Sequence, residues 1–276
     1  MIKNIVVNLP VGTKHDAGIN FSVSVARTLE AHLTAVAFIY VPFVPGSPFE
    51  GTVAGIIQIQ RNEAEKAAKS AVAKFEEAAR NSGLLTDARL LEAGPAGAAH
   101  LFGSVARRFD LSIVSQAEPE AVEPARSIVE AALFESGRPV LVVPYIQKAP
   151  LKLDRAMVCW DGSRNAARAI GDAMPFLVRT KAVEVITVAG EPAKSNELPG
   201  ADIAHHLARH GLKVELERQV VRDIDVASTI LSRAADKGID LIVMGGYGHS
   251  RLREFILGGA TRGILNSMTV PILMSH

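Results

Sequence analysis

Short apolar runs alternate with segments of helical periodicity along the whole chain. In the second half, runs rich in β-branched residues predict strands near 156–160, 183–188, 213–220, 241–244 and 271–274. Ser163 is placed to cap a helix. A second helix is predicted over Ile224–Lys237, because Asp223 or Asp225 stands at its start and Gly238 follows its end. Short strands alternating with helices predict right-handed crossovers. We therefore predict an α/β fold with an open parallel sheet of about five strands, order 3-2-1-4-5, and helices on both faces.

The chain also repeats itself. Three landmarks recur in the same order: Ile5–Asn8 with Ala156–Asp161, Val105–Val114 with Ala234–Val243, and the proline-led strands Pro139–Val143 with Pro271–Met274. Landmarks repeated in order indicate a tandem duplication. We predict two similar domains over 1–147 and 151–276, joined by a short linker near Tyr145–Pro150.

The first half carries extra chain between Tyr40 and Gly83. This insertion, 42–60, is apolar, and its prolines and glycines predict an irregular start before an Ala-rich helix over Glu63–Arg80. It is either a surface excursion or an apolar lid or contact patch.

Composition narrows the class of protein. Hydrophobic residues make up 48% and charged residues 21%, which suits packed cores and excludes disorder. Lys+Arg is 30 against Asp+Glu 29, so there is no electrostatic footprint for nucleic acid. A single cysteine, Cys159, excludes a disulfide scaffold and suits a reducing compartment. No apolar run approaches the roughly 20 residues that span a bilayer. We expect a soluble, cytoplasmic protein with no nucleic-acid or membrane partner.

The most informative segment follows the strand predicted at 241–244. Gly245 and Gly248 allow the backbone to turn so that N–H groups converge on an anion. After a loop that carries His249, the run Gly258–Thr261 opens the last helix, whose free N–H groups favour a phosphate. The alternative is that the glycines only make a tight strand–loop–helix turn. Neither a Walker A loop nor a G-x-G-x-x-G dinucleotide motif is present.

A second set of residues lies where the first strand of this half ends. In a 3-2-1-4-5 sheet, strand order reverses between the first and fourth strands, and ligands bind there. Asp161 is placed to accept a hydrogen bond from a base or sugar, and Gly162 leaves room for it. Asp161 is alternatively a loop or capping residue, and the two roles are compatible.

Together these residues resemble the universal stress protein family. Its ATP-binding members carry G-x2-G-x9-G-[ST], read here as Gly245, Gly248, Gly258 and Gly259. The departure is Gly259 where Ser or Thr is usual, which loses a hydroxyl and keeps the N–H. The resemblance implies that Asp161, Val188 and Met244 border adenine and ribose and that the glycines and following amides hold the phosphates. The expected nucleotide-binding set is Asp161, Gly162, Ser163, Val188, Met244, Gly245, Gly248, His249, Gly258, Gly259 and Ala260.

The resemblance implies a tandem universal stress protein. It would bind ATP or a related adenine nucleotide, with or without Mg²⁺, in its C-terminal half and act as a stress-response sensor or regulatory module. We find no general base and no Mg²⁺-ligand motif, so we predict no catalytic residues and at most slow ATP hydrolysis. The alternative is an interaction scaffold that binds no nucleotide. An adenylate-forming or pyrophosphatase enzyme would need catalytic residues that the sequence does not offer.

The resemblance also implies pairing through the last strand of each domain. We predict an intramolecular pseudo-dimer of the two halves through Pro139–Val143 and Pro271–Met274, and leave open a homodimer and an unidentified protein partner.

The first half is predicted to have lost the nucleotide site. Asn8 is taken to stand where Asp161 stands, and Glu118 and Glu120 occupy the segment that replaces the glycine loop. Their charges would repel a phosphate. We therefore expect one nucleotide per chain.

Two further features receive structural interpretations. His206 and His210 have an i, i+4 ligand spacing, but no third donor follows at useful spacing, so we interpret them, with His205, as solvated surface histidines and predict no metal site. Cys159 lies in an apolar strand and is interpreted as a buried structural thiol.

Overall fold

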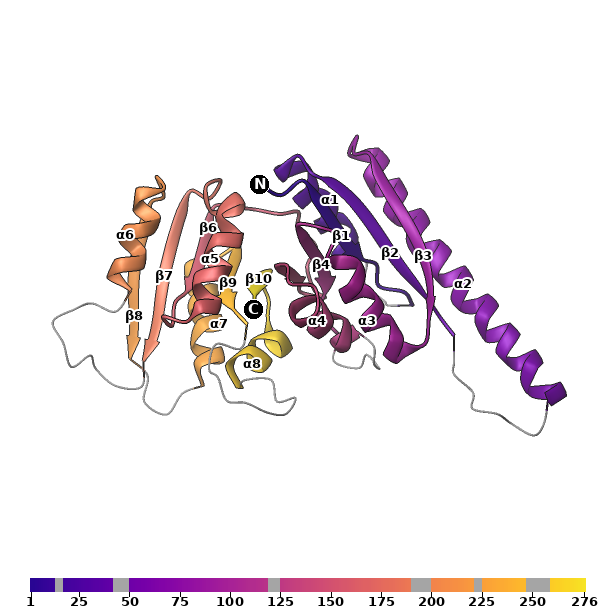
Figure 1. Cartoon of the computed structure of the whole chain (residues 1–276). Helices are drawn as coiled ribbons and strands as arrows, with labels where there is room; N and C mark the ends of the chain where they lie inside the picture. The colour runs from indigo at the N-terminus through magenta and orange to yellow at the C-terminus, as the bar shows by residue number, and fades with distance from the viewer. Residues whose placement is uncertain (13–16, 42–49, 119–124, 190–199, 221–224, 247–258) are drawn as a thin grey trace. The chain divides into compact units, whose positions relative to one another are not determined.

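The computed structural model describes the chain outside residues 13–16, 42–49, 119–124, 190–199, 221–224 and 247–258 (Figure 1). It divides into two compact units, Ile2–Pro150 and Leu151–His276. How the two units pair stays a prediction, and each is described by itself below. No helix among the described residues is both long and apolar enough to cross a membrane.

The first unit is a parallel sheet of order β3-β2-β1-β4-β5. Helix α1 packs against α2, and α3 packs against α4. The elements are β1 (Asn4–Asn8), α1 (Ala17–Leu29), β2 (His32–Tyr40), α2 (Glu50–Asn81), β3 (Thr86–Ala93), α3 (Pro95–Ala106), β4 (Leu111–Ser115), α4 (Ala125–Phe134) and β5 (Val140–Val143).

The second unit has the same topology, with a parallel sheet of order β10-β9-β6-β7-β8. Each unit is therefore a 3-2-1-4-5 sheet, which confirms the predicted α/β class. The elements are β6 (Arg155–Cys159), α5 (Arg164–Leu177), β7 (Ala182–Ala189), α6 (Ala201–Arg209), β8 (Val214–Val220), α7 (Val226–Lys237), β9 (Leu241–Gly245), α8 (Gly259–Ser267) and β10 (Ile272–Ser275).

The helix ends of the second unit follow local chemistry. The Ser163 hydroxyl caps α5 by accepting from Ala166 N at 3.1 Å. The Asp225 carboxylate caps α7 by accepting from Ser228 N at 3.2 Å, and Gly238, at φ 60°, ends that helix. Each cap satisfies backbone groups that the helix itself leaves unpaired. Of the two starts that the sequence offered, the N-cap of α7 is thus Asp225.

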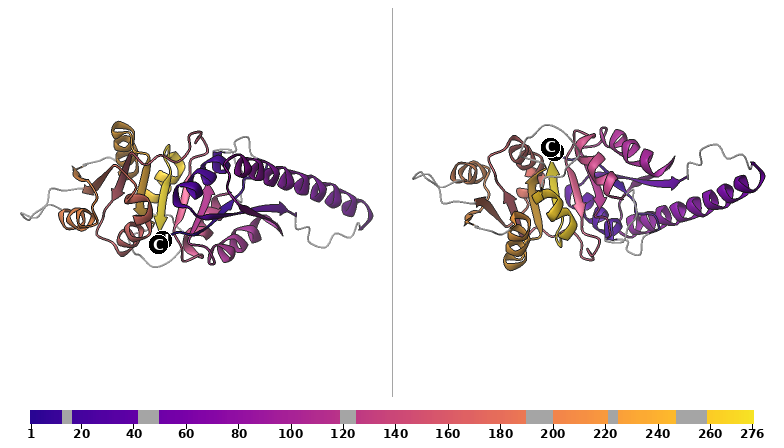
Figure 2. Two further views of the ribbon diagram at one scale, coloured as in Figure 1. Left: turned by 90° about the horizontal axis from the view of Figure 1, so that it is seen from above. Right: turned by 90° about the horizontal axis from the view of Figure 1, so that it is seen from below.

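The insertion differs from its prediction. Helix α2 begins at Glu50, well before the predicted start at Glu63, and Figure 2 shows it running beyond the sheet of the first unit. Gly51 and Gly55 are poor helix formers, but each costs only about 1 kcal/mol, which a long helix tolerates. An ion pair between Arg61 and Glu92 fixes the helix to the end of β3. The proline-rich start of the insertion lies outside the described residues.

Equivalent hydrogen bonds align the two units residue by residue. Leu9 N donates to Val36 O at 2.8 Å, and Trp160 N donates to Ile186 O at 2.9 Å, so Leu9 and Trp160 are equivalent. It follows that Asn8 matches Cys159. The sequence prediction that Asn8 stands in place of Asp161 was therefore wrong by two residues, and Pro10 holds that place.

A second pair of contacts shows that the predicted match of Val105–Val114 with Ala234–Val243 is shifted by one residue. Asp110 Oδ2 accepts from Lys3 N and Asn4 N at 2.8 and 2.9 Å, and Asp240 Oδ2 accepts from Asp154 N and Arg155 N at 2.9 and 3.0 Å. Asp110 thus matches Asp240, whereas the sequence pattern set it against Ile239. Each aspartate ties the first strand of its unit to the fourth.

Candidate functional site

The candidate site of the second unit lies where β6 and β9 end. Strand β6 pairs with β7 on one side and with β9 on the other, so strand order reverses at this point. Cys159 is in register with Met244, which brings the two strand ends to one edge of the sheet. The ligand sites of open α/β sheets lie at such an edge.

The turn after β6 presents a carboxylate to solvent. Asp161 is exposed, and its Oδ1 accepts from Ser163 N at 2.9 Å. Gly162 between them has φ 75°, a conformation that favours glycine. One carboxylate oxygen is therefore held by the turn, and the other stays available to a donor such as a hydroxyl or amine.

At the end of β9, Gly245 is required by packing. A Cβ atom built on it would lie 2.6 Å from Ala166 N and 2.7 Å from the carbonyl carbon of Asn165. Both atoms are backbone of the first turn of α5, which cannot move aside without disturbing the helix. Gly245 therefore lets α5 approach the strand, and this role does not depend on a ligand.

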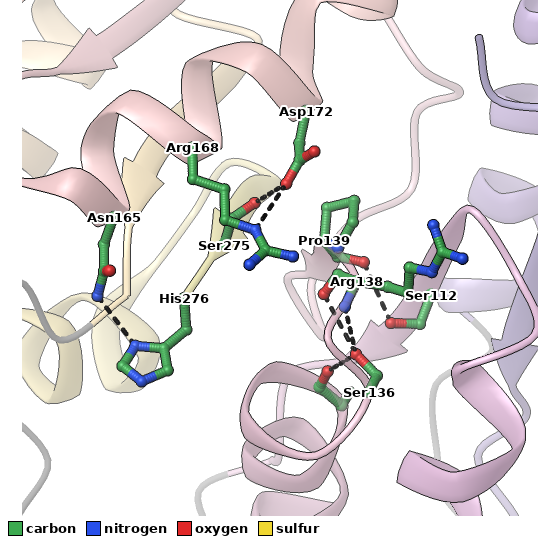
Figure 3. A network of polar contacts seen from close by, with 10 residues as sticks. Ser112, Ser136, Arg138, Pro139, Asn165, Arg168, Asp172, Ser275 and His276 are labelled. Atoms are coloured by element: carbon green, nitrogen blue, oxygen red, sulfur yellow. Dashed lines mark hydrogen bonds and ion pairs between the residues drawn. The ribbon is translucent and has the colours of Figure 1, made fainter.

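Asn165 is a site residue that sequence reasoning missed. The residue is 5% exposed, and its Nδ2 donates to Gly246 O at 2.7 Å. His276 Nδ1 lies 2.9 Å from the same nitrogen (Figure 3), and Gly246 N donates to Ser275 O at 2.8 Å. Asn165 thus fixes the backbone at the start of the glycine segment. An asparagine in the first turn of a helix looks like an ordinary surface residue in the sequence, so no signal marked it.

Figure 3 shows a second polar contact beside this one. Asp172 of α5 accepts a hydrogen bond from Ser275 Oγ at 2.8 Å and pairs with Arg168 Nε at 3.6 Å. The Ser275–Asp172 hydrogen bond ties α5 to the end of β10, as the Asn165–His276 contact ties its first turn to the residue after β10, whereas Arg168 and Asp172 pair within α5.

Val188 and Met244 differ in exposure. Val188, near the end of β7, is partly exposed, whereas Met244 in β9 is 7% exposed. Beside them, Trp160 lies 3.7 Å from the position of a Cβ on Gly200, the N-cap of α6. The sequence did not single out Trp160, whose partly exposed ring belongs to the same edge.

The segment predicted to hold phosphates is only partly within the described residues. Gly259 and Ala260 form the first residues of α8, with Gly259 exposed and Ala260 half-buried. Figure 1 shows α8 toward the lower edge of the second unit, where the arrowheads of β7 and β8 also point. Gly248, His249 and Gly258 lie outside the described residues.

Cys159 at the end of β6 is partly exposed and not fully buried as predicted. Desolvation, and to a smaller extent the nearby Asp161 carboxylate, raises the pKa of its thiol to about 12. A raised thiol pKa disfavours the nucleophilic thiolate at neutral pH and favours a structural role.

Side chains fill the equivalent edge of the first unit. Gln116 N donates to Val143 O at 2.7 Å as Gly246 N donates to Ser275 O, so Ser115 and Gln116 match Gly245 and Gly246. Gln116 is 6% exposed, and its Oε1 accepts from Tyr145 N at 3.3 Å. Pro10 offers no side-chain acceptor at the place of Asp161. Glu118 is partly exposed, and Glu120 lies outside the described residues. These differences favour the prediction that the first unit has lost the nucleotide site.

Comparison with known proteins identifies the family of the second half. Residues 152–276 match the model of the universal stress protein family. They form a universal stress protein domain. A universal stress protein from Synechocystis sp. is 29% identical over 143 residues, which are 49% of this chain and 46% of that protein. One from Methanocaldococcus jannaschii is 34% identical over 58 residues, 20% of this chain and 36% of that protein. The chain thus spans less than half of each of these universal stress proteins.

Solved structures extend the likeness of fold to both units. A universal stress protein from Archaeoglobus fulgidus aligns with a TM-score of 0.70 at 15% identity. The alignment covers 99% of this chain and 95% of the Archaeoglobus chain. A structure from Pseudomonas aeruginosa aligns with a TM-score of 0.58 at 12% identity, covering 99% and 93%. At these identities the likeness concerns fold alone, and the first unit shares the universal stress protein fold in that sense.

Proposed function

We propose that the second half binds ATP or a related adenine nucleotide and that the chain acts as a stress-response sensor or regulatory module. One observation carries the proposal, namely the contrast between two equivalent sheet edges. In the second unit the edge offers an exposed Asp161 and a glycine backbone at Gly245 and Gly246. In the first unit Pro10, Ser115 and Gln116 take those places.

Asp161 supplies the polar recognition in this proposal. Its free carboxylate oxygen is an acceptor for a ribose hydroxyl or an adenine amine, and the left-handed Gly162 puts no side chain over it. Val188 and the partly exposed Trp160 offer apolar surface beside it for a base.

The phosphates would be held by backbone. The first N–H groups of α8, from Gly259 and Ala260 onward, have no partner within the helix, and the positive end of its dipole favours an anion. Asn165 fixes Gly246, so the segment that leads toward the phosphates starts from a rigid point. Gly248, His249 and Gly258 complete the proposed set through the family motif.

The proposal is one of binding. The described exposed carboxylates of this edge are already engaged by backbone, since one oxygen of Asp161 accepts from Ser163 N and Asp225 caps α7 through Ser228 N. We therefore propose that Mg²⁺, where present, arrives with the nucleotide, and that any hydrolysis is slow.

Calorimetric titration of the full chain with ATP, with and without Mg²⁺, tests the proposal. We expect one site per chain. Asp161→Ala should weaken binding by about tenfold or more, the loss of a charged hydrogen bond of roughly 1.5–3 kcal/mol. Asp236→Ala removes an exposed aspartate from α7 of the same unit and should leave the affinity unchanged.

The choice of Asp161 avoids a structural artefact. Gly245→Val would push a side chain into the first turn of α5, so loss of binding in that variant would report misfolding. Failure of the parent protein to bind any of ATP, ADP, AMP and cyclic AMP would overturn the proposal and favour the scaffold alternative. Two sites per chain would show that the first unit binds through other contacts.

A further inference from the structure

Helix α6 carries two histidines in contact on its exposed side. His206 and His210 are both exposed, their ring centroids are 4.9 Å apart and their ring planes meet at 65°. From the spacing of one helical turn alone we predicted no metal site here. The structure adds that the two imidazole rings are in contact, edge to face.

The backbone that carries the pair is fixed on both sides. Leu207 is fully buried, and α6 packs against β8. The helix ends at Arg209 with His210 as its C-cap. Gly211 then has φ 82° and its N donates to Ala208 O at 2.9 Å, while Leu212 is 8% exposed. An ion bound by both rings would therefore order only two side chains and no further backbone.

We propose that His206 and His210 form a two-histidine site for a late first-row divalent transition metal, of the Zn²⁺, Ni²⁺ and Cu²⁺ class. Neutral imidazole nitrogens are ligands that these metals favour, whereas Mg²⁺ and Ca²⁺ favour oxygen. Two rings one helical turn apart lie on the same face of the helix, so that both can bind a single ion.

The site supplies only two protein ligands, and this determines how tightly it binds a metal ion. Among the described residues there is no group of three or more His, Cys, Asp or Glu side chains placed to hold one metal. Water or an external donor must fill the remaining positions, so the ion exchanges readily and binds more weakly than in a closed structural site. The neighbouring charges partly cancel. Asp202 lies one turn before His206 with its Oδ1 accepting from Ile203 N at 2.8 Å, and Arg209 is exposed beside His210.

The helix offers its own control. His205 is exposed on the same helix and next to His206 in sequence, but it lies about 100° further round the helix, away from His210. His205→Gln therefore removes the same chemistry from the same segment and leaves the pair intact.

Titration of the nucleotide-free full chain with Zn²⁺, followed by calorimetry and by the histidine ring signals in NMR spectra, tests the proposal. The signals of His206 and His210 should shift together in the same proportion, and Mg²⁺ should not reproduce the shift. His206→Gln and His210→Gln should each weaken Zn²⁺ binding at this site by about tenfold or more, whereas His205→Gln should not. Because all three side chains are exposed, circular dichroism should show unchanged folds.

Two outcomes would overturn the inference. One is Zn²⁺ binding that survives in the double variant His206→Gln/His210→Gln with parental affinity and without the paired NMR shift. The other is an equal loss in His205→Gln, which would mean that the pair is not the ligand set. Neither outcome bears on the nucleotide proposal, because no nucleotide is present.

Discussion

The two units differ in which element carries the glycine where the first helix meets the fourth strand. In each, the first helix must pass close to the end of the fourth strand of the sheet. In the second unit the strand gives way, because Gly245 lacks the Cβ that would meet Ala166 N at 2.6 Å. In the first unit the helix gives way, because the missing Cβ of Gly18 would meet Ser115 Oγ at 2.5 Å. The glycine therefore lies on the strand in the second unit and on the helix in the first.

This exchange has a consequence for binding. A glycine on the strand lets α5 begin against the carboxyl edge of the sheet and adds no side chain there. A glycine on the helix allows side chains on the strand, and Ser115 and Gln116 occupy that edge in the first unit. In the proposed function the first of these edges accepts a ligand and the second does not, and the experiments below probe the packing difference between them.

The largest expected effect is that of Gly245→Ala. The new Cβ collides with backbone of α5, so we expect a loss of about 3 kcal/mol in the free energy of unfolding, at the upper end for overpacking. The matched control is Gly171→Ala within α5, where a Cβ meets nothing within 4 Å. That change should instead stabilise by roughly 0.5–1 kcal/mol, since alanine is the better helix former. Urea unfolding measures both, and a neutral Gly245→Ala would contradict the packing role.

The comparison also shows what the sequence could and could not predict. Alternating apolar runs and helical periods were sufficient for the parallel sheets, because the central strands β1, β4, β6 and β9 are short and largely buried. Ser163 and Asp225 were recognisable as caps because capping depends on local chemistry. The start of α2 was missed because Gly51 and Gly55 are weak helix breakers whose cost a long helix absorbs.

The alignment of the two halves needed three-dimensional contacts. Asn8 and Asp161 are similar polar residues after similar apolar runs, and only the bonds of Leu9 and Trp160 to the second strand reveal the shift of two. The double role of Gly245 was equally hidden, because a motif glycine and a packing glycine are the same letter. Asn165 acts through the chain fold, over a distance of many residues, and no local pattern announces it.

A smaller effect is expected from exchanging the glycine in the first unit. Gly18→Ala should cost about 1–2 kcal/mol, less than Gly245→Ala because the Ser115 side chain can rotate away. In the Ser115→Gly background the same change should be neutral or stabilising, since the obstructing Oγ is gone. A double-mutant cycle measured by urea unfolding should give a favourable coupling of about 1 kcal/mol. Additive effects would mean that the two residues do not compete for the same space.

The smallest expected effect concerns the aspartate that ties the first strand to the fourth. Partial burial tends to raise the pKa of Asp110, but hydrogen bonds from Lys3 N and Asn4 N and the nearby Arg138 charge together lower it below its usual value. Because the pKa is lower in the folded than in the unfolded chain, the carboxylate stabilises the fold above the unfolded pKa of about 3.9. That contribution is lost as the pH falls through the folded pKa.

Asp110→Asn removes the titrating group and keeps an oxygen that can accept a hydrogen bond. The stability difference between parent and variant, from urea unfolding, should be constant above about pH 5 and shrink as the pH falls below about 4. A difference that stays constant to the lowest accessible pH would show that the two N–H bonds do not depend on the charge of Asp110. In the second unit the residue equivalent to Lys3 is Asp154, whose pKa is lowered to about 2 by hydrogen bonds from Lys152 and Lys181. By the same linkage Asp154 gives the second unit an acid-sensitive contribution of its own, which Asp110→Asn should leave unchanged.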